Sequence, residues 1–279
     1  MTKTVLITGA SSGIGEETVK GLLAAGYSVY AGARRVDKMQ PLADAGARLL
    51  ALDVTDEVSI NAAVKTLLQE TGRIDVLVNN AGYGSYGALE DVPLDEARRQ
   101  FDVNIFGLAR LTQLVLPAMR AQRSGRIINI SSIGGKFGEP FGCWYHATKF
   151  AVEGLSDSLR MELHPFGIDV VVIQPGAIHT EWASIAREGM MKRSGNSAYK
   201  DGALAHFKMM LWGDQGSMPS SPGVVAKTII QAVEARKPKT RYATGGRART
   251  ILFMRRILSD RTFDATMRIA ERQVKNFKA

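Results

Sequence analysis

Near its start the chain reads Thr4-Val5-Leu6-Ile7-Thr8-Gly9-Ala10-Ser11-Ser12-Gly13-Ile14-Gly15. The apolar beginning of this stretch is typical of a short buried strand, and the glycines after it are typical of a turn. From Ile14 apolar residues recur at helical spacing up to Gly26. A strand, a glycine-rich turn and a helix N-terminus form a site for a pyrophosphate, because the turn admits close approach and the helix dipole favours its charge.

Further strand-like runs follow this unit, with helical patterns between them. The runs lie at residues 5–8, 28–31, 48–51, 76–79, 126–131 and 169–174. The longest helical patterns begin near Leu94 and Trp144. This alternation predicts an α/β chain with a single-domain Rossmann fold over residues 1–279. We expect a doubly wound parallel sheet of about seven strands with helices on both faces.

A second informative stretch runs from Cys143 to Lys149 and contains Tyr145. Residues four apart on a helix share one face, so the Lys149 ammonium is expected beside the Tyr145 phenol. A free phenol has a pKa of about 10, and a fixed positive charge stabilises the phenolate. Roughly 4 kcal/mol of such stabilisation would bring the pKa of Tyr145 near 7. The pair would then be a proton donor and acceptor suited to interconverting an alcohol and a carbonyl.

These two stretches, together with four other motifs, resemble the short-chain dehydrogenase/reductase family. Its motifs are matched in order by Thr8, Gly9, Gly13 and Gly15, by Asn79-Asn80-Ala81-Gly82, by Asn104, by Ser132, by Tyr145 and Lys149, and by Pro175-Gly176 with Thr180. The resemblance implies that Asn104, Ser132, Tyr145 and Lys149 are catalytic. Tyr145 would donate the proton, Ser132 would bind the substrate oxygen, Lys149 would also hold the nicotinamide ribose, and Asn104 would hold a water. Taken alone, Asn104 is equally consistent with a helix cap and Ser132 with a loop hydroxyl.

The end of the second strand indicates the cofactor. An NAD enzyme usually places an acidic residue there to hold the ribose 2′-hydroxyl. This chain instead has Arg34 and Arg35, and guanidinium groups suit a 2′-phosphate. We therefore predict NADP(H), with ordinary loop arginines as the alternative. The expected cofactor-binding residues are Gly9, Ser11, Ser12, Gly13, Ile14, Gly15, Arg34, Arg35, Asp53, Val54, Asn80, Ala81, Gly82, Tyr145, Lys149, Pro175, Gly176, Ile178 and Thr180.

Residues 178–223 interrupt the strand–helix alternation and are rich in methionine and aromatic residues. Methionine adapts to irregular apolar shapes, so we expect a substrate lid here, although a plain core role is the alternative. The stretch from Tyr145 to Trp182 also resembles the branch that contains 17β-hydroxysteroid and retinol dehydrogenases. That resemblance implies a small lipophilic ketone, aldehyde or alcohol (steroid-, retinoid- or fatty-like). It would be contacted by Ser132, Tyr145, His179 and Trp182.

Positive charge is concentrated at the carboxyl end. The chain has 36 Lys and Arg against 27 Asp and Glu, and 13 of the former but 3 of the latter lie from Arg236 onward. We expect residues 244–279 to form a basic helical extension. It either packs on the body with solvated arginines, which we favour, or rests on an anionic membrane surface. No nucleic-acid-binding module is recognisable, so nucleic acid is not an expected partner.

Cysteine usage and hydropathy bear on the compartment. Cys143 is the single cysteine, which excludes an intramolecular disulfide, and we expect it to be a small packing residue. No signal peptide, transmembrane segment or metal-ligand spacing is apparent, so we expect a cytoplasmic protein without a metal. The family resemblance implies a homodimer or homotetramer, assembled through outer helices such as that at residues 144–163.

Two function classes follow. The first is an NADP(H)-dependent oxidoreductase that transfers hydride between the cofactor and a lipophilic carbonyl or alcohol, with Tyr145 as proton donor and acceptor. The second is a non-catalytic NADP(H)-binding sensor or scaffold that keeps the fold without turnover. The presence of Ser132, Tyr145 and Lys149 favours the enzyme, since a protein without turnover has no chemical need for all three.

Overall fold

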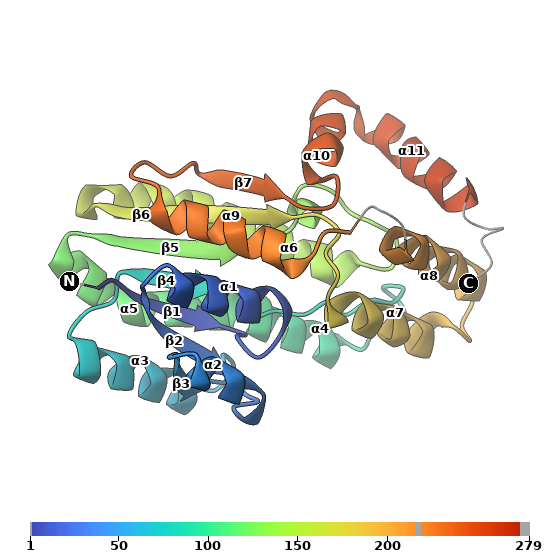
Figure 1. Cartoon of the computed structure of the whole chain (residues 1–279). Helices are drawn as coiled ribbons and strands as arrows, with labels where there is room; N and C mark the ends of the chain where they lie inside the picture. The colour runs from blue at the N-terminus through green and yellow to red at the C-terminus, as the bar shows by residue number, and fades with distance from the viewer. Residues whose placement is uncertain (1, 216–218, 274–279) are drawn as a thin grey trace.

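Across residues 2–215 and 219–273, which the computed structural model describes, a seven-stranded parallel sheet forms the centre of the molecule (Figure 1). The strands are β1 (Thr4–Thr8), β2 (Ser28–Ala33), β3 (Arg48–Ala51), β4 (Val76–Asn79), β5 (Gly125–Ile130), β6 (Ile168–Pro175) and β7 (Arg241–Thr244). Their order across the sheet is β3-β2-β1-β4-β5-β6-β7. The predicted parallel Rossmann-type sheet is thereby confirmed, and β7 is the strand that the sequence pattern did not locate.

Helices cover both faces of the sheet. The apolar residues of α1 (Gly13–Ala24), α2 (Gln40–Asp44) and α9 (Pro222–Glu234) pack on one face. Those of α3 (Glu57–Thr71), α5 (Leu108–Gln122) and α6 (Cys143–Leu163) pack on the other. Helix α4 (Leu94–Phe101) runs into α5 through a π-helical turn at Asp102–Gly107. The strands are nearly all buried on both sides, which explains their continuous apolar runs.

The segment that breaks the alternation folds as two helices, α7 (Glu181–Ser194) and α8 (Lys200–Gln215). They lie beyond the carboxyl ends of the strands, where ligands bind in folds of this kind (Figure 1). Met190 is fully buried in a cluster with Tyr86 and Tyr145, so part of this segment is core. Residues 216–218 of the predicted lid lie outside the described residues, and a lid that moves stays a prediction.

Two helices follow β7, α10 (Ala248–Ile257) and α11 (Asp260–Gln273). The Phe263 ring on α11 packs 5.3 Å from that of Phe137, and the Glu271 carboxylate lies 3.1 Å from His206. Phe253 and Ile257 are nevertheless 62% and 61% exposed. These two contacts hold α11 against the body, and contact with a membrane stays a prediction. Its last residues, 274–279, fall beyond the part that the structure describes.

One sequence-based expectation is wrong at the start of α6. Cys143 is exposed in the first turn of this helix, so it is no packing residue of the core. The helix nevertheless begins and ends where the pattern indicated, since it is followed at His164 by a 3₁₀ turn containing Pro165. Within the described ranges no helix is long and apolar enough to span a bilayer.

Candidate active site

The glycine-rich turn is built for close backbone approach. Gly9 and Gly13 have φ of 66° and 58°, a region that favours glycine. A Cβ on Gly15 would lie 2.3 Å from the Gly9 carbonyl oxygen, so this position requires glycine for packing α1 against the turn. Ser12, the residue that caps α1, makes no side-chain hydrogen bond to the helix, which leaves the amides of the first turn to another acceptor.

Hydrogen bonds join this turn to the end of the neighbouring strand β4. The amide of Asn80 donates to Thr8 Oγ1 at 3.0 Å, and that of Ala81 donates to the same oxygen at 2.9 Å. The side chain of Asn80 donates to the Thr8 carbonyl at 2.9 Å and to the Gly9 carbonyl at 3.2 Å. The sequence motif contains Thr8 but does not show that its hydroxyl accepts these two bonds. These bonds fix the crevice between β1 and β4, where the strand order reverses.

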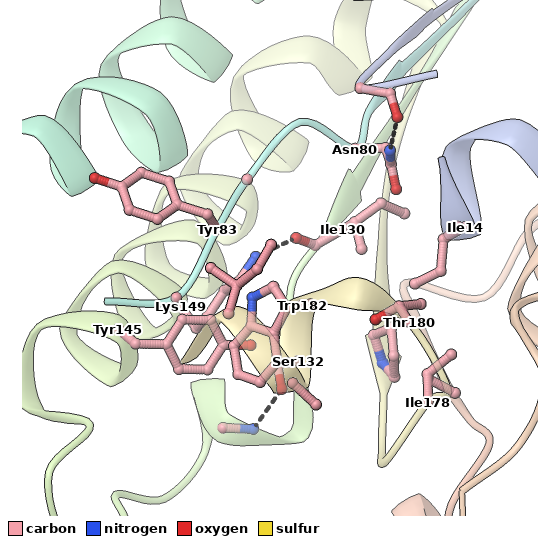
Figure 2. Close-up of a pocket in the computed structure, with 18 of the residues that line it drawn as sticks. Ile14, Asn80, Tyr83, Ile130, Ser132, Tyr145, Lys149, Ile178, Thr180 and Trp182 are labelled. Carbon is pink, nitrogen blue, oxygen red and sulfur yellow. Dashed lines mark hydrogen bonds between the residues drawn. The ribbon is translucent and has the colours of Figure 1, made fainter. Parts of the chain in front are cut away.

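A cavity of about 740 Å³ opens at this crevice (Figure 2). Most predicted cofactor-binding residues line it, namely Gly9, Ser11, Ser12, Gly13, Ile14, Arg34, Arg35, Asp53, Val54, Asn80, Ala81, Gly82, Tyr145, Lys149, Pro175, Gly176, Ile178 and Thr180. Ser132 and Trp182 line it as well. Gly15, Asn104 and His179 do not. The structure therefore brings together residues from the whole first two thirds of the chain.

Ser132, Tyr145 and Lys149 meet on one wall of the cavity, and Figure 2 shows Trp182 beside them. Ser132 caps the 3₁₀ turn at Ile133–Gly135 and accepts a hydrogen bond from the Gly134 amide at 3.0 Å. The Ser132 hydroxyl is close enough to the Tyr145 phenol to act on its pKa. Lys149 Nζ donates to the Ile130 carbonyl at 2.9 Å and lies 5.8 Å from the centre of the Tyr145 ring.

The expected fall in the pKa of Tyr145 is not found. Burial raises the pKa of Tyr145 to about 12, the neighbouring Ser132 hydroxyl opposes this rise, and Glu139 adds to it. Burial is also the main influence on Lys149 and lowers its pKa to about 8, against an opposing effect of Glu153. The sequence pattern predicted the neighbourhood of the two groups but could not include their desolvation. At neutral pH Tyr145 holds its proton, as a donor must.

The lowered pKa of Lys149 predicts a pH dependence. As pH rises through about 8 the ammonium loses its charge, so kcat/KM for the dinucleotide should fall above that value. The measurement is a pH profile of kcat/KM with the dinucleotide varied. Lys149→Arg keeps its charge over this range, and its profile should lack that limb. If kcat/KM of the wild type instead falls near the ordinary pKa of lysine, burial does not lower the pKa of Lys149.

A buried carboxylate on α6 anchors the helix that carries Tyr145 and Lys149. Glu153, one turn beyond Lys149, has a side chain that is 4% exposed. It accepts hydrogen bonds from Gln174 on β6 at 2.9 Å and from Arg241 on β7 at 2.8 Å. Lys136 Nζ lies 2.8 Å from the same carboxylate. These partners lower the pKa of Glu153 and keep it ionised despite its burial. Sequence pattern does not reveal this residue, because its partners are distant in the chain.

Asn104 lies behind the cavity wall, in the π-helical turn between α4 and α5. Its amide nitrogen donates to the Tyr83 carbonyl and to Thr148 Oγ1, both at 3.0 Å, and its oxygen accepts from the Tyr83 amide at 3.1 Å. This side chain therefore joins the strand-end loop at Tyr83 to α6. π-Helical turns are frequent at functional sites. A bound water at Asn104 stays a prediction.

His179 is a correction to the predicted substrate residues. It is exposed and does not line the cavity, and its amide donates to the Ser220 carbonyl at 3.0 Å. A neighbour in sequence, Trp182, does line it, with its ring 4.9 Å from that of Tyr145. The apolar part of the wall also comprises Tyr86, Phe137, Ile185, Met209, Met210 and Ile251. Several of these come from α8 and α10, so the sequence alone could not place them near Tyr145.

Comparison with known proteins agrees with this architecture. The sequence profile described as short chain dehydrogenase matches residues 3–190. The chain is 39% identical to a 3-ketodihydrosphingosine reductase of Bacteroides thetaiotaomicron, over 86% of this chain and 87% of that protein. The crystal structure of a short-chain dehydrogenase from Streptomyces avermitilis superposes with a TM-score of 0.79 at 34% identity, covering 100% of both chains.

A further solved structure bears on the dinucleotide. The 3-ketoacyl-(acyl-carrier-protein) reductase of Brucella melitensis, in complex with NADH, is 28% identical with a TM-score of 0.71, over 88% of this chain and 98% of that one. Among the residues described here, no group of His, Cys, Asp and Glu is arranged to hold a metal ion. From the matched profile, the relatives and the shared fold, the chain belongs to the short-chain dehydrogenase family of oxidoreductases.

Proposed function

We propose that this protein is an NADP(H)-dependent oxidoreductase that interconverts a ketone or aldehyde with an alcohol on a lipophilic substrate. The observation that carries the proposal is the convergence of Ser132, Tyr145 and Lys149 in one cavity with the glycine-rich turn and an apolar wall. A proton donor, a group for the substrate oxygen and a phosphate-binding turn are the parts that such a reaction requires.

The residues present fit a nicotinamide dinucleotide. The first turn of α1 would hold the pyrophosphate, since its amides are not capped by Ser12 and Gly9 and Gly13 allow close approach. Ile178 and Thr180 would border the nicotinamide, and Lys149 would bind its ribose. When bound, the cofactor supplies or accepts the hydride.

The protein's own groups manage the proton. In reduction the Tyr145 hydroxyl donates its proton to the oxygen of the carbonyl as charge develops there. Ser132 donates a hydrogen bond to the same oxygen and stabilises that charge. The raised pKa of Tyr145, about 12, keeps the donor protonated at neutral pH. The charge of Lys149 favours the phenolate that remains, and oxidation of the alcohol would use these groups in reverse.

Cofactor preference is proposed from Arg34 and Arg35. Both side chains are exposed, both line the cavity at the end of β2, and no acidic residue follows that strand before Asp37. Burial raises the pKa of Asp53, but hydrogen bonds from Thr55 and the nearby charges of Arg34 and Arg99 lower it overall, which supports a position of the Arg34 charge close to that carboxyl. Arg35 donates to Ser11 Oγ at 3.4 Å, beside the turn. Two guanidinium groups at this place favour a 2′-phosphate.

Replacing Arg34 by alanine should weaken NADPH binding about 10- to 100-fold and leave NADH binding nearly unchanged, since one charge-assisted contact to the phosphate is lost. Dissociation constants of both dinucleotides, measured by fluorescence titration, test this. Arg98→Ala removes an exposed arginine that pairs with Asp95 outside the cavity and serves as the matched control. An NADPH to NADH affinity ratio that does not change in Arg34→Ala would exclude Arg34 from phosphate recognition.

A lipophilic substrate is proposed from the apolar lining of the cavity. Phe137, Trp182, Met209, Met210 and Ile251 contribute to this lining, and the Trp182 ring lies 4.9 Å from that of Tyr145. The Bacteroides relative is named for a 3-ketodihydrosphingosine, and this supports a ketone with a long alkyl chain. Steroid and retinoid substrates, assembly as a homodimer or homotetramer, and a cytoplasmic location are further proposals that rest on the family resemblance.

The experiment that tests the function is loss of NADPH absorbance with a panel of ketones and aldehydes of increasing alkyl length. We expect turnover that rises with chain length and that depends on Tyr145. NADPH binding without turnover of any member would favour the second function, a sensor or scaffold. The presence of Ser132 and Tyr145 in one cavity argues against it, because binding alone does not require them.

A further inference from the structure

The substrate side of the cavity contains a carboxylate that the proposed mechanism does not use. Glu139 lies between the 3₁₀ turn that follows Ser132 and the start of α6, and it lines the same cavity as Ser132 and Tyr145. Its side chain is 27% exposed. An ionised carboxylate in a largely apolar chamber is costly unless a donor meets it. A carboxylate at this position suits a cation or a hydrogen-bond donor on a ligand.

The other carboxylates on the cavity wall either have a partner in the protein or are exposed to solvent. Asp53 accepts hydrogen bonds from the amide and the hydroxyl of Thr55, at 2.9 and 2.8 Å. Glu96 lies 3.4 Å from an Arg193 nitrogen. Glu181 is exposed in the first turn of α7. For the carboxylate of Glu139, the one ion-pair partner within the described ranges is His146, at 3.9 Å.

His146 is a poor partner for that carboxylate. Its Nδ1 lies 2.9 Å from the Gly134 carbonyl, which can only accept, so Nδ1 carries the proton. The other ring nitrogen, Nε2, is the atom nearest Glu139 Oε2. This nitrogen is buried and has no hydrogen-bond partner in the part of the chain that the structure describes. At 3.9 Å, Glu139 Oε2 and His146 Nε2 are too far apart to hydrogen-bond each other, so the ring gives the carboxylate no donor and leaves it available to a donor on a ligand.

These two side chains lie beside the reacting groups. The His146 ring centre is 5.5 Å from that of Tyr145 and 6.4 Å from that of Tyr86. Tyr86 in turn lies 5.7 Å from Tyr145. The wall around them is apolar and includes Phe137 and Trp182. A ligand bound here therefore contacts the Glu139 carboxylate near the Tyr145 phenol and is otherwise surrounded by apolar side chains.

We propose that Glu139, with His146 behind it, forms an anionic subsite beside Tyr145 that binds an ammonium or hydroxyl group of the substrate. The substrate is then an amphipathic carbonyl or alcohol: a donor group, best a primary ammonium, stands close to the reacting carbon, and an alkyl chain follows the apolar wall. This inference rests on the proposed function, because it takes Tyr145 as the point where the carbonyl oxygen binds. It excludes a wholly apolar substrate as the preferred one.

The test uses three probes that share a ten-carbon chain and differ in the head group: decylammonium, decanol and decanoate. Their affinities for the NADPH-bound protein are measured by calorimetry below their micelle concentrations. We expect wild type to bind decylammonium about tenfold or more tighter than decanol, which corresponds to one charge-assisted contact, and decanoate weakest. In Glu139→Gln the three probes should bind with similar affinity. In Glu139→Lys decanoate should bind tightest and decylammonium weakest.

Two results would overturn the subsite. Equal wild-type affinities for the three probes would show that the carboxylate does not select a donor. Tightest binding of decanoate would show that Arg247, a basic residue on the same cavity wall, governs head-group choice instead. Glu162→Gln removes an exposed carboxylate from the end of α6, outside the cavity, and should keep the wild-type order.

A second readout separates this inference from the proposed reaction. Tyr145→Phe should lose turnover yet keep the Glu139-dependent order of the probes. If wild type shows that order but reduces no carbonyl, the reaction is wrong and the subsite stands. If wild type reduces a plain alkyl ketone and its α-amino counterpart with equal kcat/KM, and Glu139→Gln changes neither, the subsite is wrong and the reaction stands.

Discussion

Tyr145→Phe is expected to lower carbonyl reduction roughly 10²- to 10⁴-fold while NADPH binding changes little, because the variant loses the proton donor and keeps the ring. The ring packs against Tyr86 and Trp182, at 5.7 and 4.9 Å, so phenylalanine should keep the shape of the wall. The measurement pairs steady-state turnover with the dissociation constant of NADPH. A fall in turnover without a fall in affinity assigns the loss to the chemical step.

Tyr199→Phe is the matched control for this variant. It removes a phenol oxygen that donates to Glu90 on the surface, outside the cavity, and should leave turnover unchanged. If Tyr145→Phe reduced carbonyls at the wild-type rate, the donor would have to be another group. If it instead lost NADPH binding, the phenol would hold the cofactor rather than donate the proton.

Glu153→Gln is expected to lower the free energy of unfolding by about 3 kcal/mol or more, which is a large share of the stability of most domains. The variant keeps the size of the side chain and removes the charge that faces Arg241 and Lys136. Removing the charge of Glu153 from this buried cluster leaves Lys136 without that carboxylate and Arg241 with Asp157 as its remaining carboxylate partner among the described residues. Chemical denaturation followed by circular dichroism gives the free energy.

The same substitution should move the pH profile. Glu153 acts to raise the pKa of Lys149, so its loss should lower that pKa further. The limb of kcat/KM near pH 8 should therefore shift to lower pH. Glu162→Gln, at an exposed position of the same helix, should change neither stability nor the profile. A loss below about 1 kcal/mol would place Glu153 among surface pairs, which contribute little.

Much of the fold followed from local pattern. The stretch from Thr4 to Gly15 specifies a strand, a turn and a helix within a few residues, and the structure has all three in order. Strand β7 was missed because it is short, begins at Arg241 and is only partly buried, so its apolar signal is weak. Local pattern thus predicts elements best where both faces of a strand are covered.

The site was predictable only in part. Spacing along one helix predicted that Tyr145 and Lys149 lie together, and their distance agrees with it. The direction of the pKa shifts was not predictable, because burial depends on α7 and the rest of the wall. Glu139 and Glu153 were missed for the same reason, because the role of each depends on residues that are distant in sequence and come close only in the folded chain. His179 shows the converse: adjacency in sequence to Thr180 did not place it in the cavity.

The short segment from Ile178 to Trp182 touches both compartments of the cavity. A Cβ on Gly13 would lie 3.2 Å from the Thr180 methyl group at the turn, while Trp182 packs on Tyr145 at the reacting end. Under the proposed function, dinucleotide and substrate both contact this segment, so we expect each to change the binding free energy of the other. Thermodynamic linkage then requires reciprocity. The factor by which bound dinucleotide increases the affinity for substrate equals the factor by which bound substrate increases the affinity for dinucleotide.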